Sequence, residues 1–159
     1  MNILTVNLVF STLVFWAAAR LYVLPNLARW TPQAVLLPIL LLHSFRHLGL
    51  MFLAPGGVYA GMPWQFAYPA AFGDLLVAVL AMAAILTRMP RPLVWTFNVL
   101  GTVDLLAAIT LATIYQATDF MGPAYWIPAF WVPALLVTHL LTFIILLRDE
   151  KSPAPAARQ

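Results

Sequence analysis

Residues 34–54 read AVLLPILLLHSFRHLGLMFLA, an apolar run whose only ionisable residues are His43, Arg46 and His47. About 20 helical residues cross a hydrocarbon core of roughly 30 Å, so this run predicts a membrane-spanning helix. Helices are favoured over strands because backbone groups in lipid must pair within their own segment. Four more runs share this character. We therefore expect five spanning helices, at residues 3–24, 34–54, 69–87, 93–115 and 128–147.

The composition excludes a water-soluble globular domain. Of 159 residues, 64% are hydrophobic and 8% are charged, and this charged fraction is about a third of the usual value for soluble domains. The absence of cysteine excludes a disulfide scaffold and a cysteine-based zinc site. No internal repeat or linker is visible. We expect an all-α bundle that forms one domain over residues 1–150, followed by a disordered cytoplasmic tail at 151–159.

The basic residues indicate how the bundle is oriented. Two connections between the runs, at residues 55–68 and 116–127, contain no Lys or Arg. The other two connections and the C-terminal tail hold almost all of the basic residues: Arg20, Arg29, Arg88, Arg91, Arg148, Lys151 and Arg158. The positive-inside rule then predicts an external N-terminus, a cytoplasmic C-terminus and a multi-pass location in the plasma (inner) membrane. No basic stripe or motif points to a nucleic-acid partner.

Six ionisable residues lie inside the apolar runs, where each costs on the order of 2.5 to 3.5 kcal/mol to insert. They are His43, Arg46, His47, Asp74, Asp104 and His139. On an α-helix, His43 and His47 share one face, with Arg46 about 60° to the side. At about 1.5 Å per residue, the histidines and aspartates fall within a slab roughly 8 Å thick, which predicts one buried site. One arginine and two aspartates leave one excess negative charge, which calls for a proton or a cation.

One interpretation of this site is a metal centre. His43, His47, Asp104 and His139 could ligate zinc or non-haem iron, because neutral imidazole is the commonest metal ligand. A haem variant uses His139 with His43 or His47 as axial ligands. Asp74 would act as a base or as a partner of a ligand, and Arg46 would orient an anionic group. This hypothesis predicts a membrane-embedded metalloenzyme with redox or hydrolytic chemistry on a lipid-soluble substrate.

Two other interpretations stay open. The chain could be a proton-coupled carrier or a channel-like subunit in which Asp104 and His139 gain and lose protons. Alternatively, Arg46 pairs with Asp104 or Asp74 in a purely structural network, and the histidines bond across helices to polar groups such as Asn98. These interpretations differ in what neutralises the excess charge.

The two connections without basic residues combine turn formers with aromatic residues, as in GGVYAGMPW at 56–64 and MGPAYW at 121–126. They read as an aromatic belt with tight turns, or as a compact lid over the bundle. The first run has a polar outer half that suits a helix contact and leaves a homodimer open. Its polar residues are Asn2, Thr5, Asn7, Ser11 and Thr12.

Overall fold

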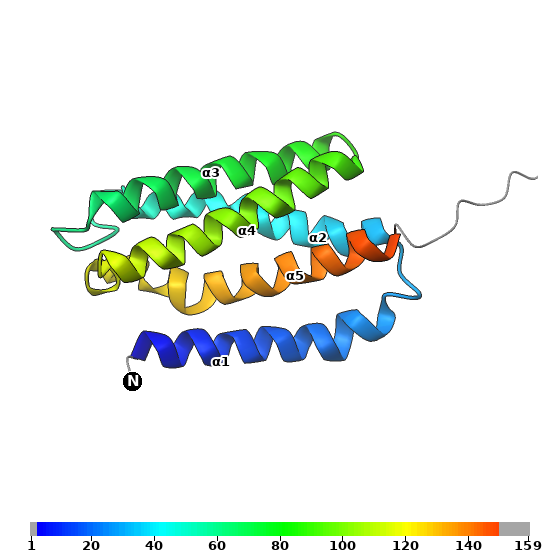
Figure 1. Cartoon of the computed structure of the whole chain (residues 1–159), viewed down its shortest axis with the longest axis horizontal. Helices are drawn as coiled ribbons and strands as arrows, with labels where there is room; N and C mark the ends of the chain where they lie inside the picture. Colours follow the sequence, from blue (N-terminus) through cyan, green and yellow to red (C-terminus); the bar gives the residue numbers. More distant parts are fainter. Residues whose placement is uncertain (1–2, 150–159) are drawn as a thin grey trace, which may run out of the picture.

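A computed structural model of the chain describes residues 3–149 and shows an all-helical bundle over that range (Figure 1). Five of its helical segments are long and apolar enough to cross a membrane, which confirms the expected number of long apolar helices. These segments run over Ile3–Asn26, Pro32–Phe52, Trp64–Leu86, Arg91–Ile114 and Gly122–Arg148.

Each segment is built around one α-helix, and three of them also contain 3₁₀ or π turns. The α-helices are α1 (Ile3–Ala18), α2 (Pro32–Ser44), α3 (Trp64–Leu86), α4 (Arg91–Ile114) and α5 (Val132–Asp149). The other elements are η1 (Ala19–Val23), η2 (Leu24–Asn26), η3 (Phe45–Phe52), η4 (Ala117–Phe120), η5 (Gly122–Tyr125) and η6 (Ile127–Trp131).

Helix boundaries follow local capping. The α2 helix begins at Pro32, and the hydroxyl oxygen of Thr31 before it accepts a hydrogen bond from the backbone N–H of Ala34 at 3.3 Å. Proline suits the first helical position because the N–H that it lacks has no helical partner there. The α3 helix begins at Trp64 rather than at the predicted residue 69. Pro69 lies inside the helix, where it removes one backbone hydrogen bond near the helix start.

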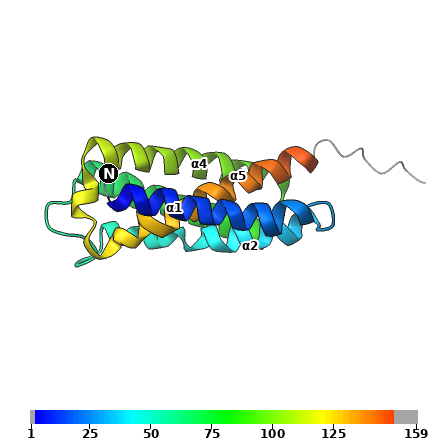
Figure 2. The same cartoon turned by 90° about the horizontal axis from the view of Figure 1, so that it is seen from below.

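The helices α2, α3, α4 and α5 enclose the centre of the bundle, and α1 lies at its edge (Figures 1 and 2). Packing of α1 is against α5 and η6. Only 6% of its spanning window is buried inside the protein, compared with 50% for the segment that contains α5. Most of the α1 surface would therefore face lipid in a membrane.

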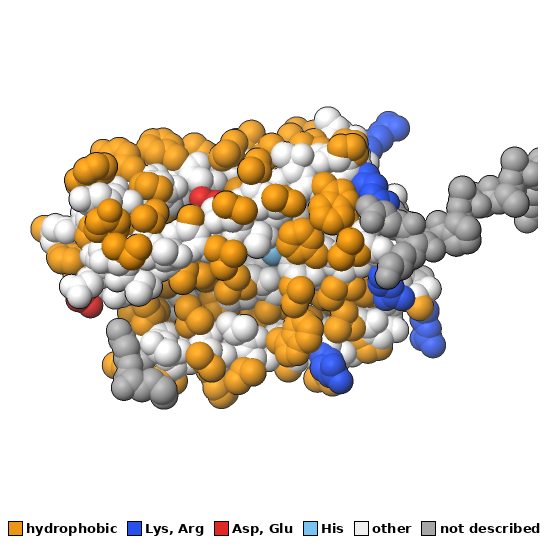
Figure 3. Space-filling view, in the orientation of Figure 1, with side chains coloured by type: hydrophobic (Ala, Val, Ile, Leu, Met, Phe, Trp, Pro, Cys, Tyr) orange, Lys and Arg blue, Asp and Glu red, His pale blue; other side chains and the backbone are white. Residues whose placement is uncertain are grey.

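Apolar side chains cover the face of the bundle shown in Figure 3, and the basic side chains gather at one end. The topology explains this sorting, because the connection from α1 to α2, the connection from α3 to α4 and the end of α5 all lie there (Figure 1). The described basic residues of this arginine end are Arg20, Arg29, Arg88, Arg91 and Arg148.

Candidate functional site

Arg46 is the centre of a buried polar network between η3, α3, α4 and α5, and its side chain has no exposed surface. Its Nε donates to Oδ1 of Asp74, and its Nη2 donates to Oδ2 of Asp104, both at 2.6 Å. Its Nη1 donates to the backbone carbonyl of Gly101 and to Nε2 of His139, both at 3.2 Å. The two short contacts are typical of charge-assisted hydrogen bonds. One guanidinium thus ties three other helices to η3.

A change of helix type brings Arg46 into this position. The α2 helix ends at Ser44, and residues Phe45–Phe52 form a 3₁₀ helix. With three residues per turn, positions i and i+3 lie on the same side. The buried residues from the end of α2 through this stretch follow that spacing: His43, Arg46, Gly49 and Phe52. Such a long 3₁₀ run is uncommon. Here it places His43 and Arg46 on the same side of the chain, toward the network.

The same change of helix type turns His47 away from the site. The side chain of His47 is exposed, and its Nδ1 lies 2.9 Å from the carbonyl oxygen of Ser44. At three residues per turn, His47 stands about 120° from His43, so the shared face expected for an α-helix is absent. The structure brings together the other predicted site residues: His43, Arg46, Asp74, Asp104 and His139.

His139 is held in one tautomer by Asn98. The side-chain Nδ2 of Asn98 donates to the backbone carbonyl of His139 at 3.3 Å, which turns the amide oxygen toward the ring. That oxygen lies 2.8 Å from Nδ1 of His139, so Nδ1 carries the hydrogen and donates it. The Nε2 lone pair then accepts from Nη1 of Arg46. Both ring nitrogens of His139 are therefore engaged.

His43 packs beside His139. The centroid of its ring lies 4.3 Å from that of His139 and 5.0 Å from that of Phe97. Its Nε2 lies 2.9 Å from Oγ1 of Thr138, whose hydroxyl donates to the carbonyl of Ala134 at 2.8 Å. Thr138 therefore accepts the Nε2 hydrogen of His43. This leaves Nδ1 of His43 as a buried lone pair without a hydrogen-bond partner in residues 3–149.

Three glycines leave space for the side chains of the network, and none of them was predicted from the sequence as part of the site. A Cβ atom on Gly49 would overlap the carboxyl group of Asp74, and one on Gly73 would overlap that of Asp104. A Cβ atom on Gly101 would collide with the imidazole of His139. Glycine permits such close approach of side chains to backbone. A usable signal exists in the sequence, because each glycine lies within three residues of an ionisable network residue on its own helix.

The geometry gives no support to the predicted zinc, iron or haem site. The guanidinium of Arg46 lies between Asp104 and His139, and its N–H groups use one carboxylate oxygen and the imidazole lone pair that a metal would need. Within the described range, no three or more His, Asp or Glu side chains are grouped so that they could hold a metal ion. The exposed position of His47 removes a further expected ligand.

The network contains two carboxylates for one fixed positive charge. The side chains of Asp74 and Asp104 are 13% and 19% exposed, compared with 0% for Arg46. With both carboxylates ionised and both histidines neutral, the cluster carries one excess negative charge. An unbalanced charge in apolar surroundings is costly, so a proton or a cationic group stabilises this arrangement.

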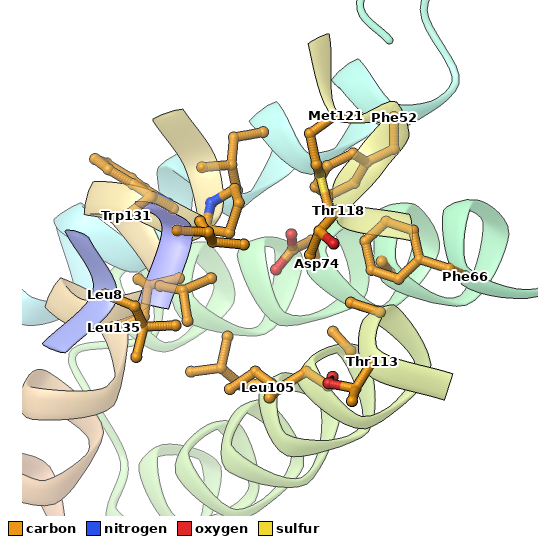
Figure 4. Close-up of a pocket in the computed structure, with 18 of the residues that line it drawn as sticks. Leu8, Phe52, Phe66, Asp74, Leu105, Thr113, Thr118, Met121, Trp131 and Leu135 are labelled. Atoms are coloured by element: carbon orange, nitrogen blue, oxygen red, sulfur yellow. Dashed lines mark hydrogen bonds between the residues drawn. The ribbon is translucent and has the colours of Figure 1, made fainter. Parts of the chain in front are cut away.

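An apolar cavity of about 470 Å³ reaches one of these two carboxylates. Asp74 lines the cavity, whereas Asp104 does not. In Figure 4 the oxygens of Asp74 point into the space bordered by the other labelled side chains. Aromatic side chains from η3, α3 and η6 contribute to its wall: Phe52, Phe66 and Trp131. The cavity lies in the half of the bundle away from the arginine end, because its walls come from the start of α1 and α3 and from the end of α4.

The connection between α4 and α5 forms part of the cavity wall. It contributes Gln116, Thr118, Asp119, Met121, Ile127 and Pro128. Two backbone hydrogen bonds join it to the connection between η3 and α3, from Tyr59 N–H to Phe120 at 2.9 Å and from Ala124 N–H to Gly57 at 3.0 Å. The two connections without basic residues therefore form one structure at this end.

Comparison with known proteins identifies one family model. A model described as a domain of unknown function, DUF8737, matches residues 3–147. No curated protein and no solved structure matches the chain. The matched range includes every residue of the network and of the cavity wall.

Proposed function

We propose that this chain, which belongs to the DUF8737 family, is a proton-coupled membrane carrier of a lipid-soluble small molecule. The observation that carries this proposal is the position of Asp74, which binds Arg46 on one side and lines the apolar cavity on the other. A ligand in the cavity therefore meets a carboxylate whose charge the network does not fully balance. Binding of the ligand and binding of a proton are then linked, and each changes the affinity for the other.

Asp74 and Asp104 are the proposed holders of one exchangeable proton. Arg46 contacts Oδ1 of Asp74 and Oδ2 of Asp104, so the second oxygen of each carboxyl group remains for a proton. His139 is a poorer candidate than the sequence suggested, because both of its ring nitrogens are engaged. This assignment uses the two carboxylates in place of the predicted pair of Asp104 and His139.

We further propose that the five segments span the plasma (inner) membrane with the arginine end in the cytoplasm and the N-terminus outside, as the positive-inside rule expects. Because the chain has no cysteine, single-cysteine variants report this directly. In intact cells, a membrane-impermeant maleimide should label Tyr59→Cys and should label Arg29→Cys only after lysis. The opposite labelling pattern would overturn the orientation.

Infrared difference spectroscopy of the protein in lipid nanodiscs tests the proton-binding step. A change from alkaline to neutral pH should produce the C=O band of a protonated carboxyl group in the wild-type protein, because exposed carboxylates stay ionised over this range. In Asp74→Asn or Asp104→Asn, the remaining carboxylate is balanced by Arg46, so the band should be lost in either variant. Asp119→Asn is the matched control, because Asp119 is exposed and has no contact with Arg46 in the described network.

Two results would contradict the proposal. One is the absence of the band in the wild-type protein, and the other is its persistence in both network variants. If both variants lower the thermal stability without changing the band, the network is a structural ion-pair cluster.

A further inference from the structure

We infer that the ligand of the Asp74 cavity is a lipophilic monocation, such as a protonated amine with an apolar body. This inference rests on the proposed function and adds the chemical class of the ligand. It depends on two observations: the charge balance of the groups around Asp74, and the composition of the cavity wall.

The titratable groups of the network around Asp74 lie on η3, α2, α4 and α5. Arg46 on η3 contributes one positive charge and Asp104 on α4 one negative charge. His43 on α2 and His139 on α5 are the remaining titratable groups of the network, and their hydrogen bonds are those of neutral rings. The α1 helix supplies only uncharged side chains to the cavity. Together with the negative charge of Asp74 itself, these groups sum to one negative charge, which a single positive charge on the ligand brings to zero.

The cavity wall favours an apolar body on that cation. Apart from Asp74, the acidic residue that residues 3–149 contribute to the wall is Asp119, which is exposed at the connection after α4. Aromatic side chains line the space around Asp74, with the rings of Phe52 and Phe66 5.0 Å apart (Figure 4). Aromatic faces attract cations as well as apolar groups. A volume of about 470 Å³ lies in the range of small-molecule sites.

The exchange between proton and ligand balances in charge. Before the ligand enters, one carboxyl group of the pair holds a proton. When the cation binds, the O–H bond of that carboxyl group breaks, the proton passes to water and the carboxylate pairs with the ligand. One proton leaves for each cation bound. A neutral ligand of the same shape gives no such release.

Calorimetric titration of the purified protein in detergent tests the charge requirement without any variant. The probes are benzyltrimethylammonium and its uncharged carbon isostere neopentylbenzene, which differ in charge and hardly at all in shape. The cation should bind at least about tenfold more tightly than the isostere. A pH indicator in weak buffer should record about one proton released per cation bound. Equal affinity for the two probes, or binding of the cation without proton release, would overturn the inference.

Two variants of network residues test whether the excess negative charge causes the preference for the cation. Asp74→Asn and Asp104→Asn each remove the excess charge and keep the side-chain shape, so each should weaken binding of the cation by at least about tenfold. Binding of the isostere should change by less than about twofold, which also shows that the variant is folded. Arg29→Met is the control, and it should change binding of the cation by less than about twofold, because Arg29 lies outside the cavity wall and its exposed charge is screened by solvent. An equal loss in Arg29→Met and Asp74→Asn would contradict the role of the network.

The outcome for the ligand class is separable from the outcome for the carrier proposal. The infrared band of the protonated carboxyl group is measured without ligand and tests the proton site alone. If that band behaves as expected but the isostere binds as well as the cation, only the ligand class is wrong. If the wild-type protein lacks the band, both proposals fail.

Discussion

The Arg46→Met substitution tests the buried network most directly. Methionine keeps an unbranched side chain at the centre of the bundle and removes the guanidinium. In the wild-type structure, Arg46 has no exposed surface and donates to Asp74, Asp104, the carbonyl of Gly101 and His139. After the substitution, two carboxylates remain close together without a positive partner.

The expected loss of unfolding free energy is about 3 kcal/mol. Removing one partner of a buried ion pair costs about 3 to 5 kcal/mol, since the other charge is left uncompensated. The lower end applies because the carboxylates retain 13% and 19% exposure. Interhelical hydrogen bonds in membranes contribute only about 0.6 kcal/mol each, so the contacts to Gly101 and His139 account for about 1 kcal/mol of the total. The unpaired carboxylates therefore dominate the loss.

Reversible unfolding in mixed detergent micelles, followed by circular dichroism, measures this loss. Arg29→Met is the matched control, and because Arg29 is exposed its effect should stay within about 0.5 kcal/mol. The triple variant Arg46→Met, Asp74→Asn, Asp104→Asn contains no network charge and should recover at least about half of the loss. A loss below about 1 kcal/mol for the single variant would refute the reasoning. So would a triple variant that is no more stable than the single one.

Three further predictions concern the groups around the guanidinium. Gly73→Ala should lower the unfolding free energy by about 1 to 3 kcal/mol in the same assay, because the added Cβ meets the carboxyl group of Asp104. A much smaller loss in an Asp104→Ala background would show that the two positions are in contact. His43→Ala should lower the unfolding free energy by about 2 to 5 kcal/mol because the ring is buried, whereas the effect of His47→Ala should stay within about 0.5 kcal/mol. Equal effects of the two variants would contradict the 3₁₀ register. Asn98→Leu should cost about 1 to 3 kcal/mol, because Nδ1–H of His139 loses its buried acceptor. The Nδ1 signal of His139 should shift in nitrogen NMR spectra, and an unchanged spectrum would rule out the amide as its hydrogen-bond partner.

Most of the site composition was predictable from the sequence. Ionisable residues are so costly in apolar helices that their presence alone marks them, which is why Arg46, Asp74, Asp104 and His139 were identified as one site. The excess negative charge was also predictable, because it requires only a count. The identity of the neutralising group was not, since a metal ion, a proton and a cationic ligand satisfy the same count.

The details that distinguish those alternatives lie in short-range geometry. The direction of the His47 side chain differs by a large angle between an α-helix and a 3₁₀ helix over residues 45–52. The apolar pattern of that stretch is compatible with both helix types. Likewise, the short distance in sequence from Gly49, Gly73 and Gly101 to ionisable residues marks them as candidates, but only the structure shows that carboxyl groups and an imidazole lie against them.

The amino-acid sequence alone was enough to establish the five apolar helices, the gathering of arginines at one end and the ionisable residues that are costly to insert into lipid. Each of these depends on whether a segment lies in lipid or in water. Contacts between helices distant in the chain determined the partners of each ionisable side chain and the position of the cavity. They put the guanidinium of Arg46 where a metal ion was expected and left one carboxylate, that of Asp74, facing an apolar cavity. Such contacts depend on helix rotation and on the close approach that glycine allows, and neither follows from the hydropathy of a single segment.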